Sequence, residues 1–103
     1  MAWNLLNEPR CETWKVPVCG EPYPAWVREM AAHVKALAPH HLVTIGEEGF
    51  YSGAAPGAPG TPDRSAANPQ DWGKLVGQDF VADHSASAID FATVHLWPDN
   101  WER

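Results

Sequence analysis

The sequence predicts an α/β fold in which short parallel strands alternate with helices. Two apolar runs, Ala2–Leu6 and His41–Gly46, have the length and composition of buried strands, and residues 24–38 between them follow a helical period. A third run, Ile89–Leu96, repeats the strand pattern. Because a helix joins the first two strands, we expect them to be parallel with a right-handed crossover.

The first strand is apolar apart from Asn4 and ends at Asn7-Glu8-Pro9-Arg10, where the proline closes the run. Residues 11–23 are rich in proline and glycine and predict a loop. The helix that follows begins near Pro24 and ends before Pro39. Its expected buried face carries residues at helical spacing: Trp26, Met30, Val34 and Leu37.

The strand His41–Gly46 is followed by Glu47 and Glu48, and then by a long segment at about residues 51–78 whose first part is rich in proline, glycine and alanine. Long loops inside compact domains are usually functional, and the alternative is a linker between domains. A short helix is expected near Asp79–Ser85, ahead of the third strand.

Composition excludes several classes of function. The 103 residues fit one domain and carry 13 acidic against 7 basic side chains, a net charge of −6. No basic stripe is present to neutralise phosphates, which argues against nucleic-acid binding, and an anionic membrane surface would repel the chain. No apolar run approaches the roughly 20 residues of a membrane span, and no secretory signal follows Met1.

The two cysteines, Cys11 and Cys19, lie in the turn-rich stretch after the first strand. A local disulfide is plausible there in an oxidising compartment. A metal site is the weaker alternative, because the sequence offers no histidine at a zinc-like spacing from them.

Polar or aromatic residues stand at the C-terminal end of each predicted strand: Asn7 and Glu8, then Glu47 and Glu48, then His95 and Trp97. In parallel α/β folds this edge binds ligands. Carboxylates, an imidazole, a guanidinium and indoles on one edge indicate carbohydrate chemistry, since glycoside cleavage needs a carboxylic acid and a second carboxylate.

Each of these residues also has a non-catalytic interpretation. Glu8 in a proline turn is often simply solvated, His95 is compatible with a structural hydrogen bond, and Trp97 with a core position. The residues alone therefore predict an α/β unit with a polar edge, and leave its chemistry open.

Three sequence blocks carry a resemblance. AWNLLNEPRC resembles the fourth strand of the endo-β-mannanases of glycoside hydrolase family 5, HLVTIGEEGFY resembles the fifth, and GQDF followed by IDFATVHLWPDNW resembles the helix start and sixth strand. The resemblance implies that residues 1–103 are a fragment of a single glycosidase catalytic domain. The expected fold is thus a partial (β/α)8 TIM barrel with three parallel strands.

The same resemblance assigns roles. It implies that Glu8 is the general acid/base, that Asn7 binds the sugar and helps hold the nucleophile, and that Arg10 and Glu48 line substrate subsites. It also implies a disulfide between Cys11 and Cys19.

At the third strand, the resemblance places His95 in the hydrogen-bonded set around the catalytic carboxylates and Trp97 where the family usually has tyrosine. The family nucleophile is a glutamate at the end of the seventh strand, which this chain does not contain. Glu47 or Glu48 as a substitute is disfavoured, because retaining chemistry needs the two carboxyls about 5–5.5 Å apart across the sugar.

The expected function is retaining, endo-acting hydrolysis of β-1,4-mannosidic bonds in mannan, galactomannan or glucomannan, without a cofactor or metal. We expect a secreted, monomeric parent protein and an inactive isolated chain. Two alternatives stay open: a non-catalytic carbohydrate-binding or pseudo-enzyme product that uses Arg10, Trp97 and Trp101, and a cellulase-like specificity.

Overall fold

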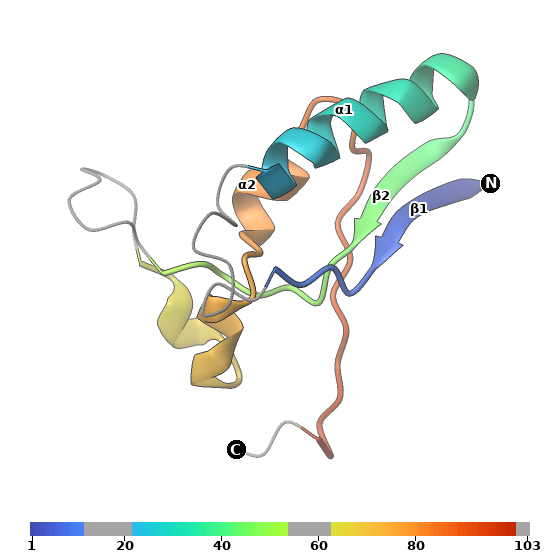
Figure 1. Ribbon diagram of the computed structural model, residues 1–103. Coiled ribbons are helices and arrows are strands. Elements are labelled where there is room, and N and C mark those ends of the chain that lie inside the picture. The colour runs from blue at the N-terminus through green and yellow to red at the C-terminus, as the bar shows by residue number, and fades with distance from the viewer. Residues whose placement is uncertain (12–21, 54–62, 101–103) are drawn as a thin grey trace.

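The computed structural model describes residues 1–11, 22–53 and 63–100 (Figure 1). The elements follow in the order β1 (Ala2–Asn7), α1 (Pro22–Leu37), β2 (Leu42–Gly46), the 3₁₀ helices η1 (Ser65–Ala67) and η2 (Asp71–Leu75), and α2 (Phe80–His84). Within these ranges no helix has both the length and the apolar character needed to cross a membrane.

The strands β1 and β2 are parallel, which confirms the predicted strand–helix–strand unit. Their register pairs Ala2 with Leu42 at one end and Asn7 with Gly46 at the other, with an irregularity between Asn4 and Asn7. Figure 1 shows α1 running along the pair as the crossover connection. The C-terminal ends of both strands therefore lie together, where the sequence placed its polar residues.

The buried face of α1 differs from the predicted one. Val27 and Ala31 are fully buried, whereas Leu37 is 74% exposed and Trp26 is only partly buried. The i, i+4 spacing was predicted correctly, but the buried stripe is shifted by one residue to a pair of smaller side chains. Small side chains at the contact let the helix approach β2 closely.

The core lies between α1, β2 and the segment after β2. Its fully or almost fully buried apolar side chains are Val27, Ala31, Val43, Ile45, Phe50 and Val76. Phe50 also packs edge-on against Trp72, with ring centroids 4.9 Å apart. This contact joins η2 to the segment that follows β2.

The prediction of a third strand is wrong, because residues 89–96 do not form a strand. The segment nevertheless lies beside β2: Asp90 N donates to Val43 O at 2.8 Å, and His95 N donates to Glu48 O at 3.1 Å. Between these two bonds the side chain of Thr93 donates to Ile45 O at 2.6 Å, and Asp90 Oδ2 accepts from Val43 N at 2.7 Å. Side chains thus occupy positions that a regular ladder gives to the backbone.

The predicted loop at about residues 51–78 contains the two 3₁₀ helices in its described part, and residues 54–62 lie outside that part. Asn68 closes it by exchanging two hydrogen bonds of 2.8 Å with the backbone of Tyr51. The short helix expected near Asp79–Ser85 is confirmed as α2, and Asp79 caps it by accepting from Ala82 N at 3.1 Å.

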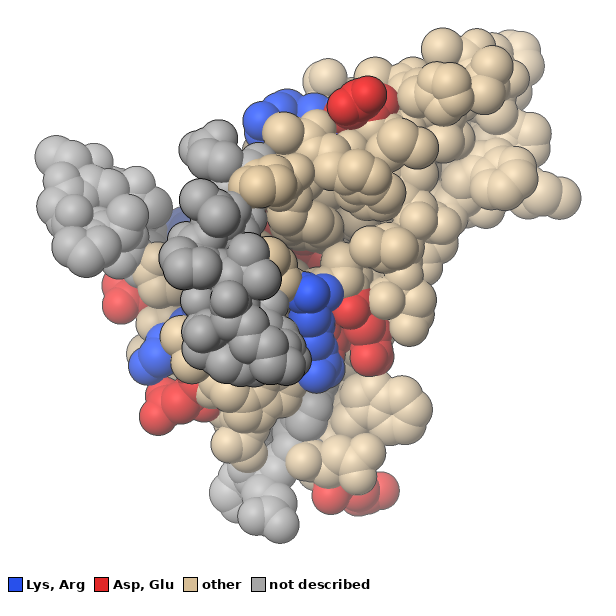
Figure 2. All heavy atoms as spheres, in the orientation of Figure 1, with Lys and Arg blue, Asp and Glu red and all other residues tan. Residues whose placement is uncertain are grey.

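The outer side of β1 is apolar and open to solvent. Trp3 is 50% exposed and Leu6 43% exposed, and Figure 2 shows mostly uncharged atoms over this end of the molecule. In a parallel α/β fold both faces of a strand are normally covered, so side chains of this kind are usually buried.

Gly46 provides a test of how closely the two strands approach. A Cβ at this position would overlap the carbonyl oxygen of Leu6 and lie 2.6 Å from Asn4 Nδ2. We expect Gly46→Ala to lower the free energy of unfolding by about 1–3 kcal/mol, because β1 must move to admit the methyl group. Urea unfolding measures the change. Gly53→Ala is the matched control, since nothing lies within 4 Å of its added Cβ; equal effects of the two variants would contradict the packing described here.

Candidate functional site

Glu8 lies directly after β1, at the point where the backbone turns out of the sheet. Its amide donates to Gly46 O at 2.7 Å, and its φ of 47° lies in the left-handed region that non-glycine residues rarely adopt. The buried Pro9 follows. Backbone strain of this kind is retained where neighbouring contacts fix it, and such positions cluster at functional sites.

The carboxyl group of Glu8 lies next to His95. Glu8 Oε1 is 2.9 Å from His95 Nδ1, and Glu8 Oε2 is 4.0 Å from Arg10 Nη2. The Glu8 side chain is about one-third exposed. It is thus held by a partner on the 89–96 segment and still reaches solvent, as a group that exchanges protons with a ligand must.

Arg10 binds Glu48 with both ends of its guanidinium group. Nε donates to Glu48 Oε2 at 3.0 Å, and Nη2 bonds the other oxygen, Oε1. The Glu48 side chain is almost completely buried, while that of Arg10 is 41% exposed. The guanidinium carbon also lies 4.9 Å from the ring centroid of Trp72, a cation–π geometry that helps to fix the orientation of the guanidinium group.

Gln78, which the sequence reasoning did not single out, connects the turn after β1 to the end of β2. It is 1% exposed, and its Nε2 donates to Pro9 O at 2.8 Å and to Glu48 Oε2 at 3.1 Å. Nothing local signals this role, because Gln78 is 69 residues from Pro9. Only its place in the GQDF block marked the segment.

Two adjoining pockets share Glu8 and Trp97. The first, of about 240 Å³, is lined by Glu8, Arg10, Glu48, Trp97 and Asn100. The second, of about 360 Å³, is lined by Asn7, Glu8, His95, Leu96 and Trp97. All six site residues expected to act on substrate therefore border one continuous region, although they come from three separate segments of the chain.

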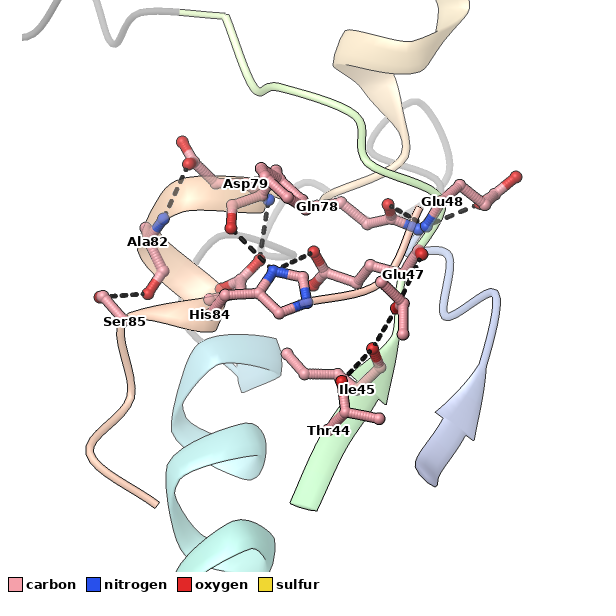
Figure 3. Close-up of polar contacts among 12 residues, drawn as sticks. Thr44, Ile45, Glu47, Glu48, Gln78, Asp79, Ala82, His84 and Ser85 are labelled. Atoms are coloured by element: carbon pink, nitrogen blue, oxygen red, sulfur yellow. Dashed lines mark hydrogen bonds and ion pairs between the residues drawn. The ribbon is translucent and has the colours of Figure 1, made fainter. Parts of the chain in front are cut away.

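Glu47 points away from that region. Figure 3 shows it extending toward His84 of α2, while Glu48 lies on the side of Gln78. Glu47 is fully buried, and its Oε1 accepts a 2.8 Å hydrogen bond from the hydroxyl of Tyr23. Burial, followed by the charge of Asp83, raises the pKa of Glu47 to about 8, and burial together with Glu47 raises the pKa of Tyr23. Glu47 is therefore not available as a nucleophile in the pocket.

The remaining predicted positions are placed only in part. Cys11 is disulfide-bonded, but its expected partner Cys19 lies outside the described residues, as does Trp101. In the described ranges no three His, Cys, Asp or Glu side chains are grouped so that they could hold a metal ion.

Chemically, the region offers a half-buried carboxyl beside an imidazole, a fixed guanidinium and a 55% exposed indole. Its second carboxylate, Glu48, is already bound by Arg10 and Gln78. This arrangement suits proton transfer at Glu8 and contact with a sugar-like ligand at Arg10 and Trp97.

The first part of the chain matches a known family. Residues 1–56 match the family described as GH family 5 beta-mannosidase-like. The matched residues include β1, Glu8, Arg10, α1, β2 and Glu48.

Curated relatives match almost the whole chain. A putative mannan endo-1,4-beta-mannosidase 5 from Oryza sativa subsp. japonica is 45% identical over 98% of this chain and 19% of its own length. Mannan endo-1,4-beta-mannosidase 5 from Arabidopsis thaliana is 42% identical over 97% of this chain and 21% of its own length. The chain thus spans about a fifth of the length of these relatives.

Solved structures also match almost the whole chain. The endo-1,4-beta-D-mannanase from Thermotoga petrophila RKU-1 superposes with a TM-score of 0.73 at 38% identity, over 98% of this chain and 26% of that one. The endo-1,4-beta-mannanase from Rhizomucor miehei superposes with a TM-score of 0.67 at 32% identity, over 97% and 26%.

Proposed function

The chain belongs to the β-mannosidase-like group of glycoside hydrolase family 5, and from that premise we propose that it forms one sector of an endo-β-1,4-mannanase barrel, with Glu8 as its general acid/base. The observation that carries the proposal is the Glu8 carboxyl, held 2.9 Å from His95 Nδ1 at a strand end and bordering both pockets. Two solved structures that superpose on almost the whole chain are, by name, endo-mannanases.

Glu8 would protonate the glycosidic oxygen as the bond breaks and then deprotonate the attacking water. His95 holds one carboxyl oxygen of Glu8 and so fixes the direction in which the other can donate. Arg10 and Trp97 line the same pocket as Glu8. There Arg10 would bind sugar hydroxyls, and Trp97 would stack on a sugar ring. Asn7 would bind sugar hydroxyls from the second pocket.

The nucleophile of the retaining reaction is supplied by another part of the barrel. Glu48 is engaged by Arg10 and Gln78, and Glu47 is buried toward α2, so neither presents an unbound carboxylate to the sugar. The 103-residue chain alone is therefore expected to show no hydrolysis of mannan. The parent protein is proposed to be secreted, which the disulfide at Cys11 supports.

The test uses the full-length enzyme that carries this segment, with mannan, galactomannan, glucomannan and cellulose as substrates. We expect hydrolysis of the mannans, and proton NMR of a short manno-oligosaccharide digest should show the β-anomer as first product. A first product of α configuration contradicts retention. Faster hydrolysis of cellulose than of mannan contradicts the proposed substrate, and binding of galactomannan by the isolated chain without hydrolysis by the full enzyme would favour a carbohydrate-binding role.

A further inference from the structure

Gln78 is a buried polar residue that borders neither of the two pockets containing Glu8. Its side chain is 1% exposed, and it lies just before Asp79, the N-cap of α2. The linings of the two pockets include residues that it contacts, but not Gln78 itself. A buried amide without hydrogen bonds is costly, so the partners of this side chain show what it holds in place.

Both donors of the Gln78 amide group are used. Nε2 donates to Pro9 O at 2.8 Å and to Glu48 Oε2 at 3.1 Å, while Oε1 accepts from Glu48 N at 3.4 Å. Figure 3 shows the Gln78 side chain directed at Glu48. A carboxamide supplies two donors and an acceptor, whereas a carboxylate of the same shape supplies no donor. The contacts of this position therefore require an amide.

The residues just before Gln78 hold the same turn through the backbone. Cys11 N donates to Val76 O at 2.8 Å. Gly77 has a φ of 77°, a conformation that glycine adopts without strain. This turn lets the Val76 carbonyl and the Gln78 side chain both reach residues 9–11. Residues 76–78 thus form a support segment for the turn that follows β1.

The turn after β1 needs support because its first residue is strained. Glu8 has a φ of 47°, and such a conformation persists only where surrounding contacts fix it. On the strand side Glu8 N donates to Gly46 O at 2.7 Å, and on the other side Gln78 binds the Pro9 carbonyl. The backbone is therefore held both before and after the Glu8 side chain.

We propose that Gln78 is a positioning residue for the reaction, which fixes the direction in which the Glu8 carboxyl faces the glycosidic oxygen. It acts on Glu8 through the Pro9 carbonyl, and on Arg10 through the Glu48 carboxylate that Arg10 binds. The inference rests on the proposed function of Glu8. Since a misplacement of about 1 Å can cost on the order of 10²-fold in rate, a small movement of the turn is enough to matter.

A purely structural role for Gln78 predicts a different kinetic pattern. If the side chain only stabilised the fold, its loss would impair substrates with good and poor leaving groups alike, and its effect would be independent of Glu8. If Gln78 acts through Glu8, its loss should matter little once residue 8 can no longer donate a proton.

The test is a double-variant cycle in the full-length enzyme that carries this segment, with Glu8→Gln, Gln78→Met and their combination. Methionine is similar in length to glutamine and offers no donor. We expect Gln78→Met to lower kcat on mannan by about 10–10²-fold, with a smaller change in KM. The first step on an aryl mannoside whose phenolate leaves without protonation should be much less impaired.

The combination gives the decisive comparison. In the Glu8→Gln background, Gln78→Met should lower kcat on mannan by less than about threefold. Losses that multiply in the double variant overturn the positioning role, and so does a wild-type kcat in Gln78→Met. If Glu8→Gln impairs mannan hydrolysis and the Gln78 variants do not, the role of Gln78 is refuted while the proposed function stands.

Two further variants control for stability. Val27→Ala removes fully buried apolar atoms from α1 and leaves the hydrogen bonds of Gln78 in place, so it should lower the midpoint of urea unfolding without changing kcat on mannan. Gln78→Asn keeps a buried amide but is one methylene shorter, so it cannot reach both acceptors. It serves as the test where Gln78→Met does not fold: we expect a lower kcat on mannan, and a wild-type value contradicts the proposal.

Discussion

Replacing Glu8 by Gln in the full-length enzyme is expected to lower kcat/KM for mannan by about 10²–10⁴-fold. The amide keeps the shape of the side chain and can still hydrogen-bond to His95, but it has no proton to give to the glycosidic oxygen. Binding should change little, because Arg10 and Trp97 are untouched, so most of the loss is expected in kcat.

A substrate with a better leaving group distinguishes loss of the proton donor from a general loss of activity in Glu8→Gln. An aryl mannoside whose phenolate leaves without protonation does not need an acid, so its first step should be much less impaired by Glu8→Gln than mannan cleavage is. Glu29→Gln removes a carboxyl from the exposed side of α1 and should leave both substrates unaffected. Equal losses of activity on mannan and on the aryl mannoside would contradict the assignment of Glu8 as the proton donor.

The parallel pair and its helix were predictable because they depend on local patterns. Apolar runs of strand length and a helical period bounded by prolines locate β1, α1 and β2 to within about two residues. The exact buried face of α1 was not predictable in this way. Trp26 and Val27 are neighbours on the helix, and which of them faces the sheet is decided by packing against β2.

The segment 89–96 shows a second limit of local patterns. Its composition is that of a strand, and it does run beside β2 with two backbone hydrogen bonds. A regular ladder fails because Thr93 and Asp90 bond the β2 backbone through their side chains. The sequence pattern cannot reveal that side chains take the place of backbone groups as hydrogen-bond partners of β2.

For the site, one rule of parallel folds was sufficient to group residues from three segments. Polar residues at strand ends converge at one edge, and Glu8, Glu48 and His95 were found together in this way. The rule fails for Glu47, whose side chain leaves the strand on the opposite face from that of its neighbour Glu48. It also cannot find Gln78 or Trp72, since neither follows a strand and both act through contacts distant in sequence.

The Arg10–Glu48 pair should respond unequally to loss of its two members. In Arg10→Met the Glu48 carboxylate stays buried with Gln78 as its remaining side-chain donor, and we expect a loss of about 3 kcal/mol in the free energy of unfolding. In Glu48→Gln the Arg10 guanidinium is left behind instead. Because that group is 41% exposed, water can solvate it, and the expected loss is about 1 kcal/mol.

The double variant separates an unpaired buried charge from a simple loss of contacts. Adding Glu48→Gln to Arg10→Met removes the stranded carboxylate, so the double variant should be more stable than Arg10→Met alone. Arg10→Lys should recover only part of the loss, since an ammonium group cannot bond both carboxylate oxygens in the geometry of the fork. Urea unfolding of the four chains and the parent gives the comparison. If the double variant is instead less stable than either single variant, the buried Glu48 is not ionised and the energetic account of this pair is wrong.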